Sequence, residues 1–175
     1  MIDWVKTICH SQELTKRVLS DPRFKWNDTD VFSWGTLKGY ADGFEVEINQ
    51  TTGQTKIGFS LHKYFNSSTG AGNQNYNDFV FSDICQAVQS VAEYFGNEIL
   101  IADIINIEFG VNITPPIPTP ELLSGCHSHR KQLFDVEEAA GKLYYNCIHS
   151  QYRVKVYDKG LQYGLTDPAL RFELH

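Results

Sequence analysis

The chain has 175 residues, of which 42% are hydrophobic and 21% are charged, and its formal net charge is -6 at pH 7. This size and composition predict one globular domain, residues 1–175, with a sizeable core. The negative charge counts against a protein that binds nucleic acid through bulk positive charge. Positive charge is nevertheless concentrated in residues 128–160, which carry six Lys and Arg against four Asp and Glu.

The cysteines and the N-terminus indicate a cytoplasmic protein. No two cysteines form a CxxC pair, which favours reduced thiols over disulfides or a zinc site. The N-terminal sequence MIDWVKTICH has no long apolar run, and no stretch approaches the roughly 18 apolar residues that cross a membrane. We therefore expect no membrane contact.

The first part of the chain combines a helix with several strands. Residues 2–9 are predicted to form a strand, and Ser11 is predicted to cap a helix over about residues 12–19. The turn-rich segment 21–30 is predicted to be a loop. Three further strands are predicted, over residues 31–38, 44–50 and 56–64.

The last of these strands leads into a polar loop. Its alternation places Ser60 and His62 on a polar face, opposite Ile57 and Phe59. Residues 66–78 (NSSTGAGNQNYND) are rich in Asn, Gly and Ser, which predicts a mobile loop.

A helix, a strand and a linker follow. Apolar residues at helical spacing predict a helix with Ser82 as its N-cap and Gly96 as its end. Residues 104–113 are predicted to form a strand. The four prolines of TPPIPTPELLSG predict an extended linker before a short helix that begins at Thr119 or Pro120.

Three strands separate apolar from polar side chains. Successive side chains on a strand point to opposite sides, so the pattern predicts a buried apolar face and an exposed polar face. The polar sets are Asn106, Glu108 and Asn112 in residues 104–113, Arg153, Lys155, Tyr157 and Lys159 in residues 152–159, and Arg171, Glu173 and His175 in residues 171–175. The pattern predicts an α+β fold, with helices covering one face of an antiparallel sheet and the polar face left open.

Tyr157 is the strongest candidate for a catalytic residue. A phenol with a pKa of about 10 is a poor nucleophile at neutral pH unless its neighbours stabilise the phenolate. Lys155 and Lys159 lie two positions to either side and could do this, or could hold a phosphate. The alternative is a half-buried strand tyrosine flanked by lysines that promote solubility. Tyr144 and Tyr145 compete for the same role, but no basic pair flanks them.

Glu108 and Glu173 are the candidate metal ligands. Each lies in a strand whose other face is apolar, where a carboxylate needs a cationic side chain or a metal as its partner. Two such carboxylates suit Mg²⁺ or Mn²⁺. The alternative is a structural salt bridge, for instance between Glu108 and Arg171 or Lys155.

Three histidines could complete this metal site. His127 and His129 point the same way if GCHSHR is extended, and His62 lies on the predicted polar face. A loop conformation for the first two, and a hydrogen-bonded role for His62, are equally compatible with the sequence.

Several short motifs follow one another in a familiar order: SLHKYFN, NDFVFSD, INIEFGVN, KLYYNCIHSQYRVKVYDKG and LRFEL. Over most of residues 40–175, this order resembles the catalytic domain of phage and plasmid rolling-circle replication initiators. It is most similar to the gene II-type replication proteins of filamentous phages. The resemblance implies a fold similar to the HUH endonucleases, with the site on the open face of an antiparallel sheet.

The resemblance also implies an enzyme that nicks single-stranded origin DNA and leaves a 5′-phosphotyrosine and a free 3′ hydroxyl. By motif, Tyr157 matches the nucleophile, Lys159 the following lysine, Glu108 the acidic metal position, and Glu173 the other carboxylate. Asn112 lies where some relatives have a second acid. DNA contacts are expected at His62, Lys63 and Arg153, and a host helicase and replication proteins are further expected partners.

The chain departs from the family pattern in two ways. No histidine-hydrophobic-histidine triplet lies on a predicted strand, which leaves the metal shell incomplete. The chain also stops at His175, two residues after the RFE motif, so we expect a truncated or minimal domain. Two other functions stay open: a non-catalytic module that binds single-stranded DNA through aromatic stacking, and an acidic protein-interaction domain.

Overall fold

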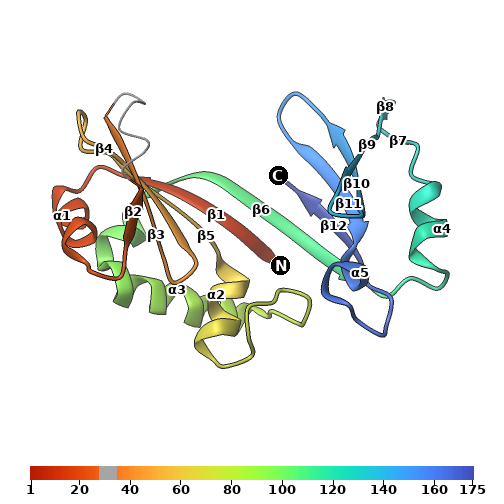
Figure 1. Cartoon of the computed structure of the whole chain (residues 1–175), viewed down its shortest axis with the longest axis horizontal. Helices are drawn as coiled ribbons and strands as arrows, with labels where there is room; N and C mark the ends of the chain where they lie inside the picture. The colour runs from red at the N-terminus through yellow and green to blue at the C-terminus, as the bar shows by residue number, and fades with distance from the viewer. Residues whose placement is uncertain (28–34) are drawn as a thin grey trace. The chain divides into compact units, whose positions relative to one another are not determined.

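The structure is a computed structural model that describes residues 1–27 and 35–175 (Figure 1). These residues divide into two compact units, one of residues 2–107 and one of residues 108–175 with Met1. The strand pairs within each unit are antiparallel. The predicted α+β fold with an antiparallel sheet is therefore confirmed. Among the described residues, no helix is long and apolar enough to cross a membrane.

In the unit of residues 2–107, the described strands follow the order β2-β3-β4-β5-β1. The strands are β1 (Ile2–Cys9), β2 (Lys25–Asn27), β3 (Thr36–Ala41), β4 (Phe44–Asn49) and β5 (Thr55–Ser60). The helices are α1 (Gln12–Ser20), α2 (Leu61–Ser68), α3 (Phe81–Phe95) and the 3-10 helix η2 (Asn97–Ile101). Phe44 lies at the centre of the core, with its ring 5.1 Å from that of Phe59 and 4.7 Å from that of Phe95.

Both helices predicted in this unit occur, with one change at a helix start. Ser11 caps α1 through a hydrogen bond that its hydroxyl accepts from Leu14 N, as predicted. The predicted N-cap Ser82 is wrong, because α3 begins at Phe81 and the Asp83 carboxylate accepts a hydrogen bond from Val80 N at 3.0 Å. The helix ends before Gly96, which has a φ of 94°, as predicted.

The strand boundaries differ in three places. The predicted loop 21–30 contains β2, which pairs with β3. The predicted strand 31–38 lies partly outside the described residues, and β3 begins only at Thr36. The predicted strand 56–64 ends at Ser60, because the Ser60 hydroxyl caps α2 by accepting a hydrogen bond from Lys63 N.

The unit of residues 108–175, which includes β6 from Glu108 onward, contains strands in the order β6-β12-β11-β10-β9, with a separate β7-β8 hairpin. The strands are β6 (Asp103–Ile113), β7 (Ser128–His129), β8 (Gln132–Leu133), β9 (Asp135–Ala139), β10 (Lys142–Ile148), β11 (Arg153–Asp158) and β12 (Leu170–Leu174). The helices are α4 (Thr119–Ser124), at the predicted place, and α5 (Lys159–Tyr163). The core of this unit consists of Leu123, Val156 and Leu170, so α4 covers the Val156 face of the sheet.

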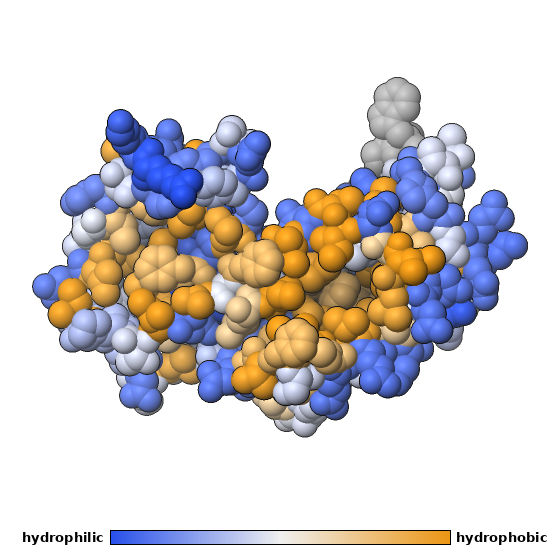
Figure 2. Space-filling model, turned by 180° about the vertical axis from the view of Figure 1, so that it is seen from behind, coloured by the Kyte–Doolittle hydropathy of each residue, from blue (hydrophilic) through white to orange (hydrophobic). Residues whose placement is uncertain are grey.

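The polar face is the more buried one in β6 and β12, contrary to the prediction. Phe109 is 45% exposed and Val111 is 51% exposed, whereas Arg171 is 0% and Glu173 is 7% exposed. Exposed apolar side chains form the orange areas in the view of Figure 2. The prediction was wrong because alternation separates the two kinds of side chain without deciding which kind is covered, and charged groups that pair with one another can be buried.

Candidate active site

The register of three strands brings the predicted site residues to one face. Lys155 of β11 pairs with Glu173 of β12, and Tyr157 pairs with Arg171. Arg171 pairs in turn with Asn112 of β6. Directly paired residues of antiparallel strands point to the same side of a sheet, so these five side chains share a face.

The hydroxyl of Tyr157 lies between an acid and a base. It donates a hydrogen bond to Glu173 Oε1 at 2.7 Å and accepts one from Lys159 Nζ at 3.1 Å. Lys159 opens α5, whose N-cap Asp158 accepts a hydrogen bond from Leu161 N. The predicted strand thus ends one residue before Lys159, yet the Lys159 ammonium reaches the Tyr157 hydroxyl. A cation in this place stabilises negative charge on the phenolic oxygen.

Arg171 ties Glu173 to the neighbouring strand β6. Its Nε donates to Glu173 Oε1 at 2.6 Å, and its Nη1 donates to Asn112 Oδ1 at 2.9 Å and lies 3.6 Å from Met1 Sδ. The guanidinium lies over Gly110, where the Cβ of any other residue would overlap it. The missing side chain at position 110 therefore makes room for Arg171.

His175 joins the two predicted metal ligands. Its Nδ1 lies 2.6 Å from Glu108 Oε1, and its Nε2 lies 3.4 Å from Glu173 Oε2. The carboxylates of Glu108 and Glu173 thus converge on one imidazole. The sequence placed His175 on the polar face but gave no reason to single it out.

The charges of this cluster shift two pKa values. Burial by itself would raise the pKa of Glu173, but the hydrogen bond from His175, the charge of Arg171 and the hydrogen bonds from Tyr157 and Arg171 lower it to about 2. Burial likewise opposes protonation of His175, but its contacts with Glu108 and Glu173 raise its pKa. Glu173 is therefore ionised at neutral pH, and the protonated form of His175 beside it is stabilised.

The donor set of this cluster fits the expected metal. Glu108, Glu173 and His175 offer carboxylate oxygens and an imidazole nitrogen, which are ligands that Mn²⁺ accepts readily. One oxygen of Glu173 is held by Tyr157 and Arg171, so Oε2 is the oxygen that faces His175.

The two other basic residues of β11 lie at the edge of this cluster. Lys155 Nζ lies 4.5 Å from the centre of the Tyr144 ring and 5.3 Å from that of the Tyr157 ring. It therefore contacts aromatic faces instead of the tyrosine hydroxyl. Arg153 Nη2 lies 3.1 Å from His175 Nδ1, at the end of the face where Glu108 lies.

Tyr157 also lines a pocket of about 180 Å³. Other residues of its lining are Pro120, Lys142, Tyr144, Tyr145 and Leu161. The pocket is mainly aromatic and apolar, which suits a stacked base.

His62 and Lys63 lie in the other unit, in helix α2 and not in a strand. His62 is buried, stacks on Phe79 at 4.5 Å between ring centres, and forms a 3.0 Å hydrogen bond through Nε2 with Asn77 Oδ1. Its predicted place on an exposed polar face is wrong, because the chain turns into a helix after Ser60. The buried imidazole leaves no exposed surface for a DNA contact.

Side-chain amides of the Asn-rich segment 66–78 hold this segment in place through hydrogen bonds. Asn75 Nδ2 donates to both carboxylate oxygens of Asp3, and Asn66 Nδ2 donates to Asn77 Oδ1 at 2.7 Å. Asp3 also accepts a hydrogen bond from the Ser60 hydroxyl. The SLHKYFN motif and this loop thus form one packed polar cluster.

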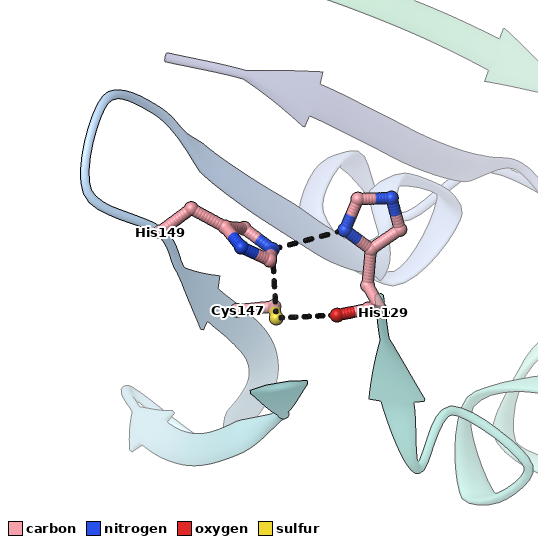
Figure 3. Close-up of side chains that lie close together, drawn as sticks. All are labelled: His129, Cys147 and His149. Carbon is pink, nitrogen blue, oxygen red and sulfur yellow. Dashed lines mark hydrogen bonds between the residues drawn. The ribbon is translucent and has the colours of Figure 1, made fainter. Parts of the chain in front are cut away.

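A second cluster was missed by the sequence analysis. His129, Cys147 and His149 bring their ligand atoms within 4.8 Å of one another and could hold a metal ion (Figure 3). Among the described residues, this group includes His129 but not the exposed His127. The only sequence signal was the alternation of Cys147 and His149 in CIH, which places both on one side of a strand.

No protein-family model matches the sequence, and no curated protein matches it. Among solved structures, the chain is similar to the rolling circle replication initiator protein from Geobacillus stearothermophilus. The TM-score is 0.55 at 10% sequence identity, over 99% of this chain and 72% of that chain. The resemblance to rolling-circle replication initiators predicted from the motifs is therefore confirmed at the level of the fold.

Proposed function

We propose that this chain is a replication initiator that nicks single-stranded origin DNA through a covalent intermediate on Tyr157. The observation that carries the proposal is the position of the Tyr157 hydroxyl between Glu173 Oε1 and Lys159 Nζ. A nucleophilic hydroxyl needs both an acceptor for its proton and a charge that stabilises its anion. The fold shared with a rolling circle replication initiator supports the same function.

The reaction is a transfer of a phosphoryl group to tyrosine. Tyr157 Oη attacks the phosphorus of the scissile phosphodiester, oriented by its hydrogen bond to Glu173, while Lys159 stabilises the phenolate and the phenolic proton is released to solvent. The bond between phosphorus and the 3′ oxygen breaks, and the 3′ oxygen takes a proton from solvent. The products are a 5′-phosphotyrosine and a free 3′ hydroxyl, and the phosphodiester is conserved for later rejoining.

Cations around the tyrosine suit a phosphate substrate. Lys159 contacts the attacking oxygen, while Lys155 and Arg153 lie along the same strand. Fixed positive charge near the phosphate stabilises the charge that develops in the transition state. The pocket beside Tyr157, with Tyr144 and Tyr145 in its wall, would hold a base of the strand by stacking.

Mg²⁺ or Mn²⁺ would be held by Glu108, Glu173 and His175. When bound, the ion would neutralise negative charge on the scissile phosphate. The lowered pKa of Glu173 keeps this carboxylate ionised, which a metal ligand requires. We expect Glu108→Ala and Glu173→Ala to weaken Mn²⁺ binding at least roughly tenfold, measured by calorimetry. Glu137→Ala, on strand β9, is the control, and parent-like binding by both site variants would make these carboxylates structural.

A covalent adduct is the direct test. The protein is incubated with Mn²⁺ and a pool of random single-stranded oligonucleotides, and denaturant-resistant adducts are measured by mass. The parent should form the adduct, Tyr157→Phe should not, and Tyr144→Phe, which alters a ring 5.2 Å from that of Tyr157, should retain it. Equal adduct formation by Tyr157→Phe would show that another residue is the nucleophile.

A non-catalytic module for single-stranded DNA is the second candidate. The observation that favours it is the burial of Tyr157, which is 4% exposed and hydrogen bonded on both sides. This module would bind the same oligonucleotides without an adduct, and its binding would not change in Tyr157→Phe.

A further inference from the structure

Cys147 and His149 lie on the side of β10 away from Tyr157. Tyr144 pairs with Tyr157 and Cys147 pairs with Val154, so the alternation of the strands puts Cys147 on the Val156 face. This is the face that α4 covers. The cluster is therefore separate from the Tyr157 site and does not depend on the function proposed for it.

The third member of the cluster comes from a very short hairpin. His129 ends β7, and β7 and β8 form two residue pairs, Ser128 with Leu133 and His129 with Gln132. The two turn residues, Arg130 and Lys131, have φ values of 49° and 68°. Side chains other than Gly, Asn and Asp adopt this left-handed conformation only when the surrounding structure holds them there. A hairpin of two pairs buries too little surface to do this alone.

Two of the donor–donor separations are close to the edges of a coordination tetrahedron, and all donor atoms lie within 4.8 Å of one another. His129 Nδ1 lies 3.0 Å from His149 Nε2, and Cys147 Sγ lies 3.4 Å from the same Nε2 (Figure 3). Zinc bonds of about 2.0 Å to nitrogen and 2.3 Å to sulfur give tetrahedral edges of about 3.3 Å between two nitrogens and about 3.5 Å between nitrogen and sulfur. Both observed separations are slightly shorter than these edges, so an ion fits after a small outward movement.

The surroundings suit a metal-bound thiolate. Cys147 is fully buried, and His149 stacks on Tyr152 with ring centres 4.5 Å apart, which fixes the imidazole. One thiolate and two imidazoles favour zinc over the hard cations that carboxylates bind. In the alternative, the Cys147 thiol donates a hydrogen bond to Gln132 O, 3.4 Å away, and the imidazoles of His129 and His149 are hydrogen bonded to each other.

We propose that His129, Cys147 and His149 bind one zinc ion, which fastens the β7-β8 hairpin to β10. Water takes the fourth position, because three protein ligands leave it open. The ion links residues that are 18 positions apart in the chain, as a disulfide would, and so stabilises the strained turn.

Elemental analysis tests the zinc content directly. Protein purified without added metal should contain about one zinc per chain. Cys147→Ala and His149→Ala should contain less than a tenth of that amount. The control is Cys126→Ala, which removes a part-buried thiol outside the cluster and should keep its zinc. A zinc-free parent that also fails to take up added zinc would overturn the proposal, as would parent-like zinc in Cys147→Ala.

Cobalt separates this site from any carboxylate site. Chelated protein refilled with Co²⁺ should show the visible bands of a tetrahedral ion and a charge-transfer band from the thiolate. Both should be absent in Cys147→Ser, with the far-ultraviolet circular dichroism checked for retained fold. Chelation should also lower the melting temperature, and added Zn²⁺ should restore it. A melting temperature that chelation leaves unchanged in zinc-loaded protein would exclude the fastening role.

Discussion

The hydroxyl of Tyr157 donates a 2.7 Å hydrogen bond to Glu173, across two neighbouring strands in which Tyr157 pairs with Arg171. Both side chains are buried, so the bond is shielded from competing water. Removing the hydroxyl leaves Lys159 without this acceptor. We expect Tyr157→Phe to lower the free energy of unfolding by about 1–3 kcal/mol, measured by urea denaturation. Tyr144→Phe, on the neighbouring strand β10, is the control, and an unchanged stability in Tyr157→Phe would mean that the hydroxyl contact is not formed.

The lowered pKa of Glu173 predicts a loss of stability in acid. Its pKa falls from 4.5 to about 2 on folding, so the folded state favours the ionised acid. The associated stability, about 3 kcal/mol, is present above pH 4.5 and is lost as the pH falls towards 2. Urea denaturation between pH 2 and 6 should show this loss, and Glu173→Gln should show a smaller slope in the same window. Identical slopes in the parent and in Glu173→Gln would mean that other carboxyl groups cause the loss of stability in acid.

The raised pKa of His175 predicts the opposite dependence. Its pKa lies above the ordinary value of 6.5, so the protonated imidazole is stabilised in the folded state by Glu108 and Glu173. This contribution is fully present below pH 6.5 and is lost as the pH rises through the raised value. Nuclear magnetic resonance titration of the imidazole should give a midpoint above 6.5, and Glu108→Gln should lower it. A midpoint at or below 6.5 in the parent would contradict the contacts of His175 with Glu108 and Glu173.

A side chain at position 110 should disturb Arg171. The Cβ of Gly110→Ala would overlap the guanidinium that bonds Glu173 and Asn112. We expect a destabilisation of about 1–3 kcal/mol, measured by thermal or urea unfolding. Gly125→Ala is the matched control, because the nearest atom to its Cβ is a backbone oxygen at 3.4 Å. Equal effects of the two substitutions would mean that Arg171 does not occupy this place.

The two lysines near Tyr157 should contribute unequally to the rate of adduct formation. Lys159 touches the hydroxyl, whereas Lys155 lies against the rings of Tyr144 and Tyr157. If Tyr157 is the nucleophile, Lys159→Met should slow adduct formation by roughly a hundredfold, and Lys155→Met should slow it far less. The rate is measured with saturating oligonucleotide, so that weaker DNA binding does not enter. A larger effect of Lys155→Met would reverse these roles.

Sequence alternation predicted some strands better than others. Alternation located β6, β11 and β12 and separated their polar from their apolar residues, because that property depends only on neighbours along the chain. The same reasoning failed beyond Ser60. The Ser60 hydroxyl caps helix α2 at this point, so the residues predicted to continue the strand are helical and His62 is buried. Local pattern could not reveal this, since alternating residues are compatible with either conformation.

The candidate site was likewise predictable only in part. The motifs named Tyr157, Lys159, Glu108 and Glu173, and the structure brings all four into one cluster. The part of His175 in it was not predictable, because it depends on the register between β12 and its neighbours. The sequence predicts Cys147 to be a reduced thiol outside any zinc site, because His129 lies 18 residues away in a hairpin too short to predict.

The sequence by itself determined that β6, β11 and β12 are strands and which of their side chains share a face. Only the tertiary structure decided that the polar face of β6 and β12 is the covered one. Contacts between strands give the buried charges of β12 their partners, since Tyr157 of β11 donates a hydrogen bond to Glu173 and Asn112 of β6 accepts one from Arg171. These contacts offset the cost of removing the charges from water. That balance depends on contacts between distant segments, which no local pattern contains.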